Sequence, residues 1–65
     1  MFILEQNIRP GTYAKFSTNE REEIVNFIGT GRVPTVFPDE LSAHETREIF
    51  GLAKRYNVVK LVKEY

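Results

Sequence analysis

The chain has no cysteine, no tryptophan and one histidine among its 65 residues. Without cysteine it can form neither a disulfide nor a thiolate metal site, so side-chain packing must hold the fold together. No apolar run approaches the roughly 18 residues that a membrane span requires, and the first residues lack the pattern of a signal peptide. We therefore expect a cytoplasmic protein that does not enter a membrane.

An excess of charge of one sign is also missing, since nine basic and nine acidic residues cancel. This balance argues against a protein that binds polyanions through bulk charge alone. With 42% hydrophobic residues the composition is that of a globular protein, and this length allows one domain, residues 1–65. Such a small domain is near the lower limit for independent folding, so a partner or a homodimer would add to its stability.

The side chains that commonly act as catalytic groups are scarce in this chain. One histidine and no cysteine leave neither a nucleophile–base pair nor a metal cluster, and no carboxylate pair marks an obvious pocket. A domain of this size also rarely encloses a pocket large enough for a typical ligand. We therefore expect no enzymatic activity, no cofactor and no bound metal.

The amino-terminal third of the chain carries a turn signal. In the segment 9–12 proline pre-sets the first central turn position, and glycine accepts the positive φ of the second. The flanking segments 2–8 and 12–16 are apolar and mixed in character. The sequence therefore predicts a hairpin, which needs further structure to pack on.

The next segment resembles a helix followed by an extended edge. Ser17 and Glu20 have the spacing of a capping box, and the isoleucine and phenylalanine residues behind them recur at helical spacing. This pattern predicts a first helix over residues 18–29. Segment 33–37 could be extended, and Pro34 confines it to an edge or to a non-strand role because proline removes a ladder donor. In the expected sheet we place it at an edge.

A second helix is the best-marked element. Ser42 and Glu45 form another capping box, and residues 40–57 fit a helix that ends at Asn57 as a left-handed cap. The mixed apolar tail, residues 58–65, predicts a strand. The expected apolar stripe of this helix is Ile49, Leu52, Ala53 and Tyr56.

These elements predict an α+β fold in which two helices pack on one face of a small, mostly antiparallel sheet. Along the chain the expected order is strand, strand, helix, a short extended segment, helix and strand.

The polar face of the second helix would bring cationic and donor side chains together. Gly51 lies in its middle at a cost of about 1 kcal/mol relative to alanine, so it needs a reason. Two reasons are open: room for a phosphate, a base or another backbone, or packing against the rest of the protein. The candidate nucleic-acid-binding residues on this face are His44, Arg47, Gly51, Lys54 and Arg55.

Several of these residues carry a family resemblance. The matching features begin with an Ile/Phe-bearing helix that ends in a Gly-containing loop (Ile24, Phe27, Ile28, Gly31). Phe37-Pro38, Leu41-Ser42, Arg47, Leu52-Ala53 and Asn57-Val58 then follow at matching spacing. In these features residues 21–58 resemble the R-three-H domain, a single-strand nucleic-acid-binding family named for an Arg and a His separated by three residues. The resemblance implies that Arg47 contacts phosphate. It also puts Gly51 where the family has its His, and the family's last strand is missing; His44 shares the face and could take the place of that His.

Two functions are therefore expected. The first is a non-enzymatic module that binds single-stranded RNA or DNA through the basic helix face, with a tyrosine as a stacking platform for an unpaired base. The alternative is a small regulatory or inhibitory module, of the phage accessory type, that binds a protein through an exposed aromatic patch or a sheet edge. The residues of this alternative are Phe37, Phe50, Val58 and Lys60.

Overall fold

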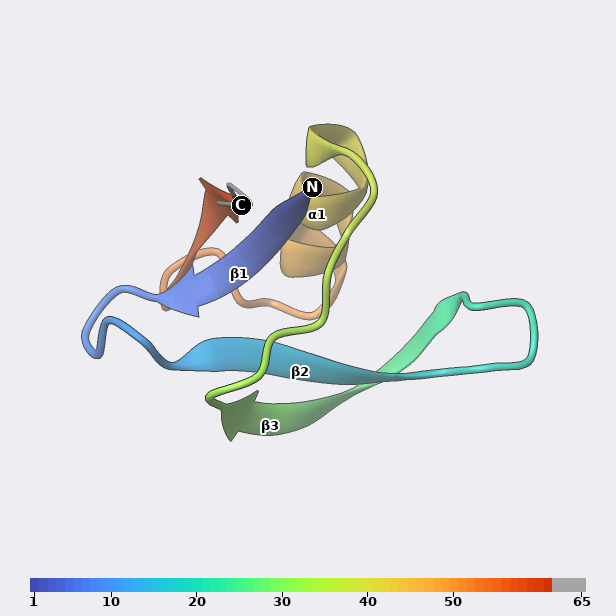
Figure 1. The fold of residues 1–65 in the computed structure, drawn as a ribbon, viewed down its shortest axis with the longest axis horizontal. Coiled ribbons are helices and arrows are strands. Elements are labelled where there is room, and N and C mark those ends of the chain that lie inside the picture. Colours follow the sequence, from blue (N-terminus) through green and yellow to red (C-terminus); the bar gives the residue numbers. More distant parts are fainter. Residues whose placement is uncertain (62–65) are drawn as a thin grey trace, which may run out of the picture.

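The computed structural model describes residues 1–61, and these residues form a four-stranded antiparallel sheet and one α-helix (Figure 1). The strand order in the sheet is β3-β2-β1-β4. The predicted arrangement with two helices is therefore wrong. The elements are β1 (Phe2–Gln6), β2 (Tyr13–Thr18), β3 (Ile24–Gly31), α1 (Glu40–Ile49) and β4 (Tyr56–Lys60).

The predicted turn between the first two strands is confirmed. The amide of Thr12 donates to the carbonyl of Arg9 over 3.1 Å, and Gly11 has the positive φ of 86° that the second central position requires. The side chain of Glu5 also accepts a hydrogen bond from the Gly11 amide at 3.0 Å. Although β1 and β2 are antiparallel, they pair at one position, Glu5 with Tyr13.

Strand β3 occupies the second half of the segment that was expected to be the first helix, and the β2–β3 turn occupies most of the first half. Thr18 pairs with Ile24 and Phe16 pairs with Phe27, so β3 has one more residue than β2 between these two pairs. This β-bulge puts Ile24 and Phe27 on the same face of the strand, where both pack against the core. Ile28, the third residue at helical spacing, is 63% exposed. The bulge thus produces the three-residue spacing that resembled a helix.

A side chain closes the hairpin between β2 and β3. The carboxamide oxygen of Asn19 accepts hydrogen bonds from the amides of Arg21 (2.9 Å) and Glu23 (3.0 Å). Short polar side chains favour such turns over helix interiors because they bond to nearby backbone amides. The polar residues that suggested a helix start therefore belong to a strand and to a hairpin turn.

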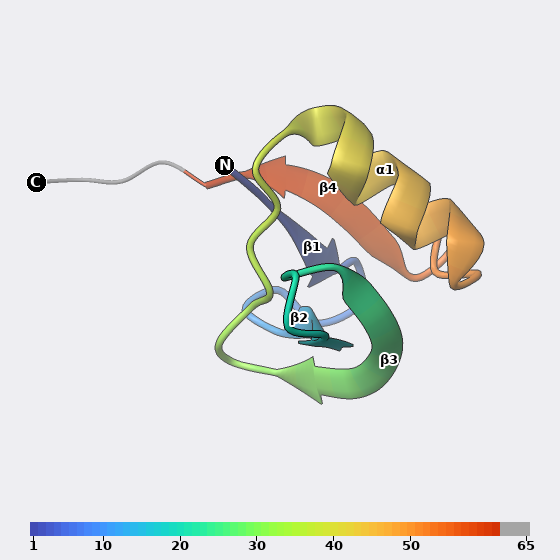
Figure 2. The ribbon, with the colours of Figure 1, turned by 90° about the vertical axis from the view of Figure 1, so that its right-hand side faces the viewer.

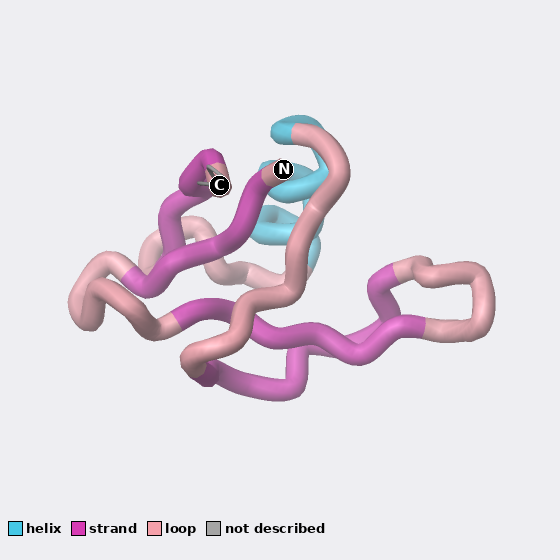
Figure 3. The backbone as a smooth tube through the Cα atoms, in the orientation of Figure 1, coloured by secondary structure: helices cyan, strands magenta, loops and turns pink. Residues whose placement is uncertain are grey.

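Segment 33–37 lies between β1 and β2, so its predicted place at an edge is wrong (Figure 3). The alternative of a non-strand role is confirmed, since the segment forms only the isolated bridge between Phe37 and Phe2. Beyond their single pair the two strands diverge, and this segment fills the gap by bonding to both. Towards β2, the Thr35 amide donates to Ala14 at 3.3 Å and the Thr35 hydroxyl accepts from Phe16 at 3.0 Å. Towards β1, Phe37 and Phe2 exchange amide–carbonyl bonds of 2.7 and 2.9 Å.

The N-cap of helix α1 lies three residues before the predicted cap, Ser42. Asp39 is the N-cap, and its carboxylate accepts a hydrogen bond from the Ser42 amide at 2.7 Å. This hydrogen bond holds the pKa of the Asp39 carboxyl below its usual value. The helix then buries Ala43 and Thr46, whereas Ile49 of the expected apolar stripe is 76% exposed.

The helix also ends early, at Ile49 instead of residue 57. Leu52 and Tyr56 are buried as the stripe prediction required, but both lie outside the helix. Asn57 is a β4 residue opposite Glu5 and is not a cap. Of the predicted carboxy-terminal strand, residues 62–65 lie outside the described residues.

The core is built around aromatic rings. Helix α1 packs against β1 and β4, while the β2–β3 hairpin curves away from them (Figure 2). Phe16 of β2 links the two parts, because its ring lies 5.4 Å from Phe27, 5.9 Å from Phe37 and 5.3 Å from Phe50, measured between centroids. Edge-to-face and tilted aromatic pairs at such distances add to the energy of simple burial. The other buried members of the core are Leu4, Ala14, Ala43, Leu52 and Tyr56.

Candidate nucleic-acid interface

Arg47, the residue expected to contact phosphate, is directed towards the protein itself. Its guanidinium donates from Nη1 to the carbonyl of Tyr56 over 3.1 Å, and its Nε is buried with no hydrogen-bond partner. Arg47 therefore ties α1 to the start of β4. Burial raises the pKa of the Tyr56 phenol above its usual value, against a smaller opposing effect of the Arg55 guanidinium.

The backbone conformation of Gly51 explains why glycine occupies this position. This explanation differs from both earlier ones, room for a ligand and packing against the rest of the protein. Its φ is +68°, and it follows the C-cap residue Phe50. The amide of Gly51 donates to the carbonyl of Glu48 at 3.1 Å, and the amide of Leu52 donates to the carbonyl of Arg47 at 2.8 Å. These two hydrogen bonds are the pair that defines a Schellman cap. A Cβ at this position would have no heavy atom within 4 Å, so the glycine provides a left-handed backbone and not space.

The other residues of the predicted basic face are dispersed by this early helix end. His44 remains on α1, where its Nε2 lies 3.5 Å from the Glu40 carboxylate. Lys54 and Arg55 lie in the loop between α1 and β4 and are exposed. A common helix face for His44, Lys54 and Arg55 is therefore not formed.

The residues of the partner-binding alternative are also distributed over different environments. Phe37 is 2% exposed and Phe50 is half-buried against Phe16, so these two rings belong to the core. Val58 is half-buried, whereas Lys60 is exposed at the end of the edge strand β4. The sheet-edge version of this alternative stays a prediction.

A different set of cations lies together at one end of the sheet, as a consequence of the strand order. β1 and β3 end there, while β2 and β4 begin there. Asn7, after β1, bonds to the loop before β4: its amide donates to Arg55 and its carboxamide to Lys54, both at 2.9 Å. We call this surface the basic end; it comprises Arg9, Lys15, Arg32, Lys54 and Arg55.

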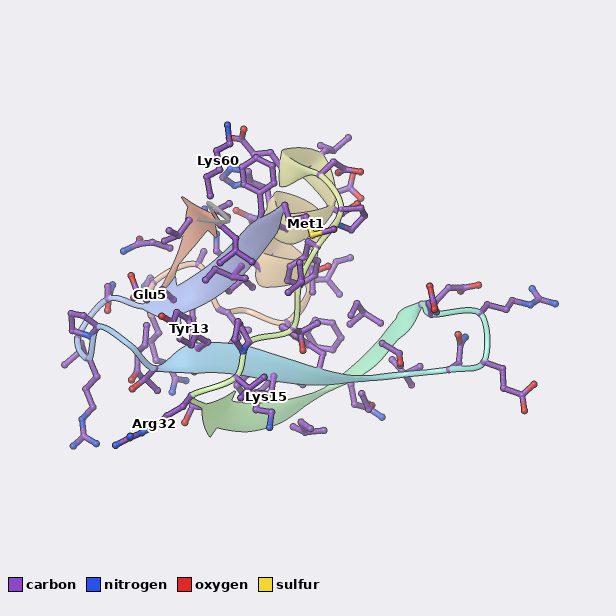
Figure 4. The ribbon with its side chains drawn as sticks, viewed as in Figure 1. Met1, Glu5, Tyr13, Lys15, Arg32 and Lys60 are labelled. Carbon is purple, nitrogen blue, oxygen red and sulfur yellow. The ribbon has the colours of Figure 1, made fainter. Side chains whose placement is uncertain are left out.

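An aromatic ring lies within this cationic surface. Tyr13 lies beside Glu5, Lys15 lies further along β2, and Arg32 lies just beyond the end of β3 (Figure 4). Tyr13 also pairs with Gly31 across the β2–β3 ladder. A Cβ on Gly31 would come within 2.7 Å of the Lys15 side chain, so the lysine stem lies over the glycine backbone. Half-buried Tyr13 thus has Lys15 two residues along its own strand and Arg32 next to its ladder partner Gly31.

None of the five cations of the basic end forms an ion pair with another described residue. Within residues 1–61 the one charged side-chain contact shorter than 4 Å is that between Glu40 and His44. Glu5, the carboxylate nearest to Tyr13 in the ladder, accepts the Gly11 amide and holds the turn. The basic end therefore presents five cationic groups to solvent or to a ligand.

Arg9 and Arg32 were missed because they are isolated in the sequence. Arg9 is the first residue of the 9–12 turn and Arg32 follows Gly31. Neither arginine belongs to a basic run. Their grouping depends on the strand order, which a sequence pattern does not give. The available signal was the strong turn at 9–12, which puts Arg9 at the end of a hairpin next to Tyr13.

The part of the chain that the structure describes contains no group of three or more metal-ligating side chains. Residues 1–61 also contain no helix with the length and apolar character to cross a membrane. Comparison with known family models, curated proteins and solved structures finds no match to this chain.

Proposed function

We propose that this protein is a non-enzymatic module of the cytoplasm that binds single-stranded RNA or DNA through the basic end. The observation that carries the proposal is that five cations without ion-pair partners among the described residues lie at the same end of the sheet as Tyr13. We therefore propose the basic end as the binding surface, in place of the helix face that the sequence predicted. Two of the residues predicted from the sequence, Lys54 and Arg55, belong to the basic end.

Phosphate binding follows from the kind and spacing of the cations. Three of the five are arginines, whose planar fork of donors matches phosphate oxygens. Because three inter-strand gaps of about 4.8 Å separate β3 from β4, the cations span about 14 Å. A backbone lying across the strand ends would therefore meet several of them in turn.

Tyr13 favours a single strand over a duplex. An unpaired base has a free face that can stack on a tyrosine ring, whereas a paired base in a duplex does not. Stacking of this kind contributes about 1–3 kcal/mol per base and tolerates any base. We therefore expect little sequence preference.

The test is fluorescence anisotropy of labelled single-stranded DNA, single-stranded RNA and duplex DNA. Five phosphate contacts on a single strand predict a slope of about −3.5 for log affinity against log salt, which is about a hundredfold loss between 50 and 200 mM. Arg32→Ala should reduce the slope by about 0.7, and Tyr13→Ala should weaken binding where Tyr13→Phe does not.

Arg21→Ala is the matched control, because Arg21 is an exposed arginine in the distant β2–β3 turn. Arg47→Ala tests the family-based prediction separately, since its guanidinium is bonded to Tyr56. The proposal is wrong if no strand binds at low salt, or if Arg21→Ala weakens binding as much as Arg32→Ala.

A further inference from the structure

A groove runs between the far end of the β2–β3 hairpin and the rest of the protein. Its larger part has a volume of about 710 Å³ and a neighbouring part about 290 Å³. The two parts adjoin each other, since both are lined by Glu22, Ile24, Val36 and Pro38. We call this the hairpin groove.

The walls of the hairpin groove are largely apolar. Met1 and Val36 line the larger part and are 62% and 43% exposed. Ile49 lines the smaller part from α1 and is 76% exposed. A small domain that leaves several large aliphatic side chains around one hollow has a surface suited to a partner.

The rim of the groove is acidic. Glu22 and Glu23 lie on the hairpin side and Glu45 on the helix side. None of the three forms an ion pair with another described residue. An occupant with an apolar centre and cationic flanks would therefore match the hairpin groove in both respects.

The protein carries such a surface at its basic end. Ile8 in the 7–12 turn is 77% exposed and precedes Arg9, and Val33 is 70% exposed beside Arg32. The turn is held by the bond between Thr12 and Arg9 and by those from Asn7 to the loop before β4. A rigid turn loses little conformational freedom on binding.

We propose that the hairpin groove receives the 7–12 turn of a second copy of this chain. Ile8 then packs against the apolar wall, and the cations of the basic end face Glu22, Glu23 and Glu45. The groove and the turn lie at opposite ends of β2, whose six residues span about 20 Å, so one copy cannot fill its own groove.

The contact is heterologous, with different surfaces on the two copies. Such contacts leave one groove and one turn free in each dimer, so they extend to rings or filaments. Because the apolar contact is small and the charged rim is exposed, association is expected to be weak and to decrease with salt.

Sedimentation velocity of the whole chain, from about 10 µM to about 1 mM, tests the proposal. The sedimentation coefficient should rise with concentration beyond a dimer, and high salt should reverse the rise. The substitutions Ile49→Ser and Ile8→Ser should each lower the association constant at least tenfold. Leu41→Ser is the control, since Leu41 is 68% exposed on α1 but does not line the groove.

Mixing the two variants gives the decisive result. Ile8→Ser keeps an intact groove and Ile49→Ser keeps an intact turn, so their mixture should form dimers that do not grow. A monomer at every concentration overturns the proposal and leaves the groove to another protein. It is overturned equally by association that Ile49→Ser does not weaken, or by a mixture that stays monomeric.

The nucleic-acid proposal is tested separately by the same variants. Ile49→Ser lies in the groove, away from the basic end, so it should leave oligonucleotide binding unchanged at concentrations where the native chain is monomeric. Failure of self-association therefore does not count against nucleic-acid binding, and failure of nucleic-acid binding does not count against self-association.

Discussion

Replacing Gly51 distinguishes a conformational role from a role in close packing. The residue has a φ of +68°, and a Cβ there would contact nothing within 4 Å. Alanine in this left-handed conformation costs about 1–2 kcal/mol because its Cβ approaches the following carbonyl oxygen. Domains of this length have total stabilities of about 3–10 kcal/mol, so Gly51→Ala should remove a sizeable part.

The assay is thermal unfolding followed by circular dichroism. A loss of 1–2 kcal/mol in a domain of this size lowers the unfolding midpoint by about 4–16 °C. Gly51→Asn is the matched variant: its side chain is larger, but asparagine tolerates the left-handed region. We expect Gly51→Asn to cost less than Gly51→Ala. If asparagine instead costs more, steric room decides at this position and the reasoning from φ is refuted.

Two predictions concern titratable groups. The pKa of Asp39 is lowered in the folded state, so its contribution to stability is complete above pH 3.8 and is lost as pH falls through the lower folded value. Urea midpoints measured across this range should fall more steeply for the native chain than for Asp39→Asn, and equal slopes would contradict the cap. The pKa of Tyr56 is raised, so in a variant with Tyr13→Phe and Tyr65→Phe the remaining phenol should ionise above pH 10.0, as read by absorbance at 295 nm. Stability from this group is full below pH 10.0 and decreases above it, and ionisation at or below pH 10.0 would show that Tyr56 is solvated.

The turn chemistry was readable from the sequence because it is local. Proline followed by glycine specified the turn at 9–12, and the bonds there are those of the expected turn. The acidic residues near Ser42 likewise indicated a helix start, although Asp39 was the cap. Signals that depend on a few neighbouring residues were therefore sufficient for these elements.

Where the prediction was wrong, tertiary structure changed the meaning of a local pattern. A bulge put Ile24 and Phe27 on one face of a strand, so a strand had the three-residue spacing of a helix. Gly51 was interpreted as an interior helix residue, although glycine is also the commonest residue just beyond a helix end. The basic end could not be predicted, since Arg9, Arg32 and Arg55 meet only through the strand order.

Segment 33–37, bonded to β1 on one side and β2 on the other, bears on the order in which the chain folds. The β2–β3 hairpin is closed by a five-residue connection, which forms quickly. By contrast, β1 pairs with β4 from opposite ends of the described chain, and such long closures are slow. Thr35 bonds to β2 and Phe37 bonds to β1, so the segment couples the local hairpin to the long-range half of the sheet. Its set of hydrogen bonds is complete only when both halves have formed.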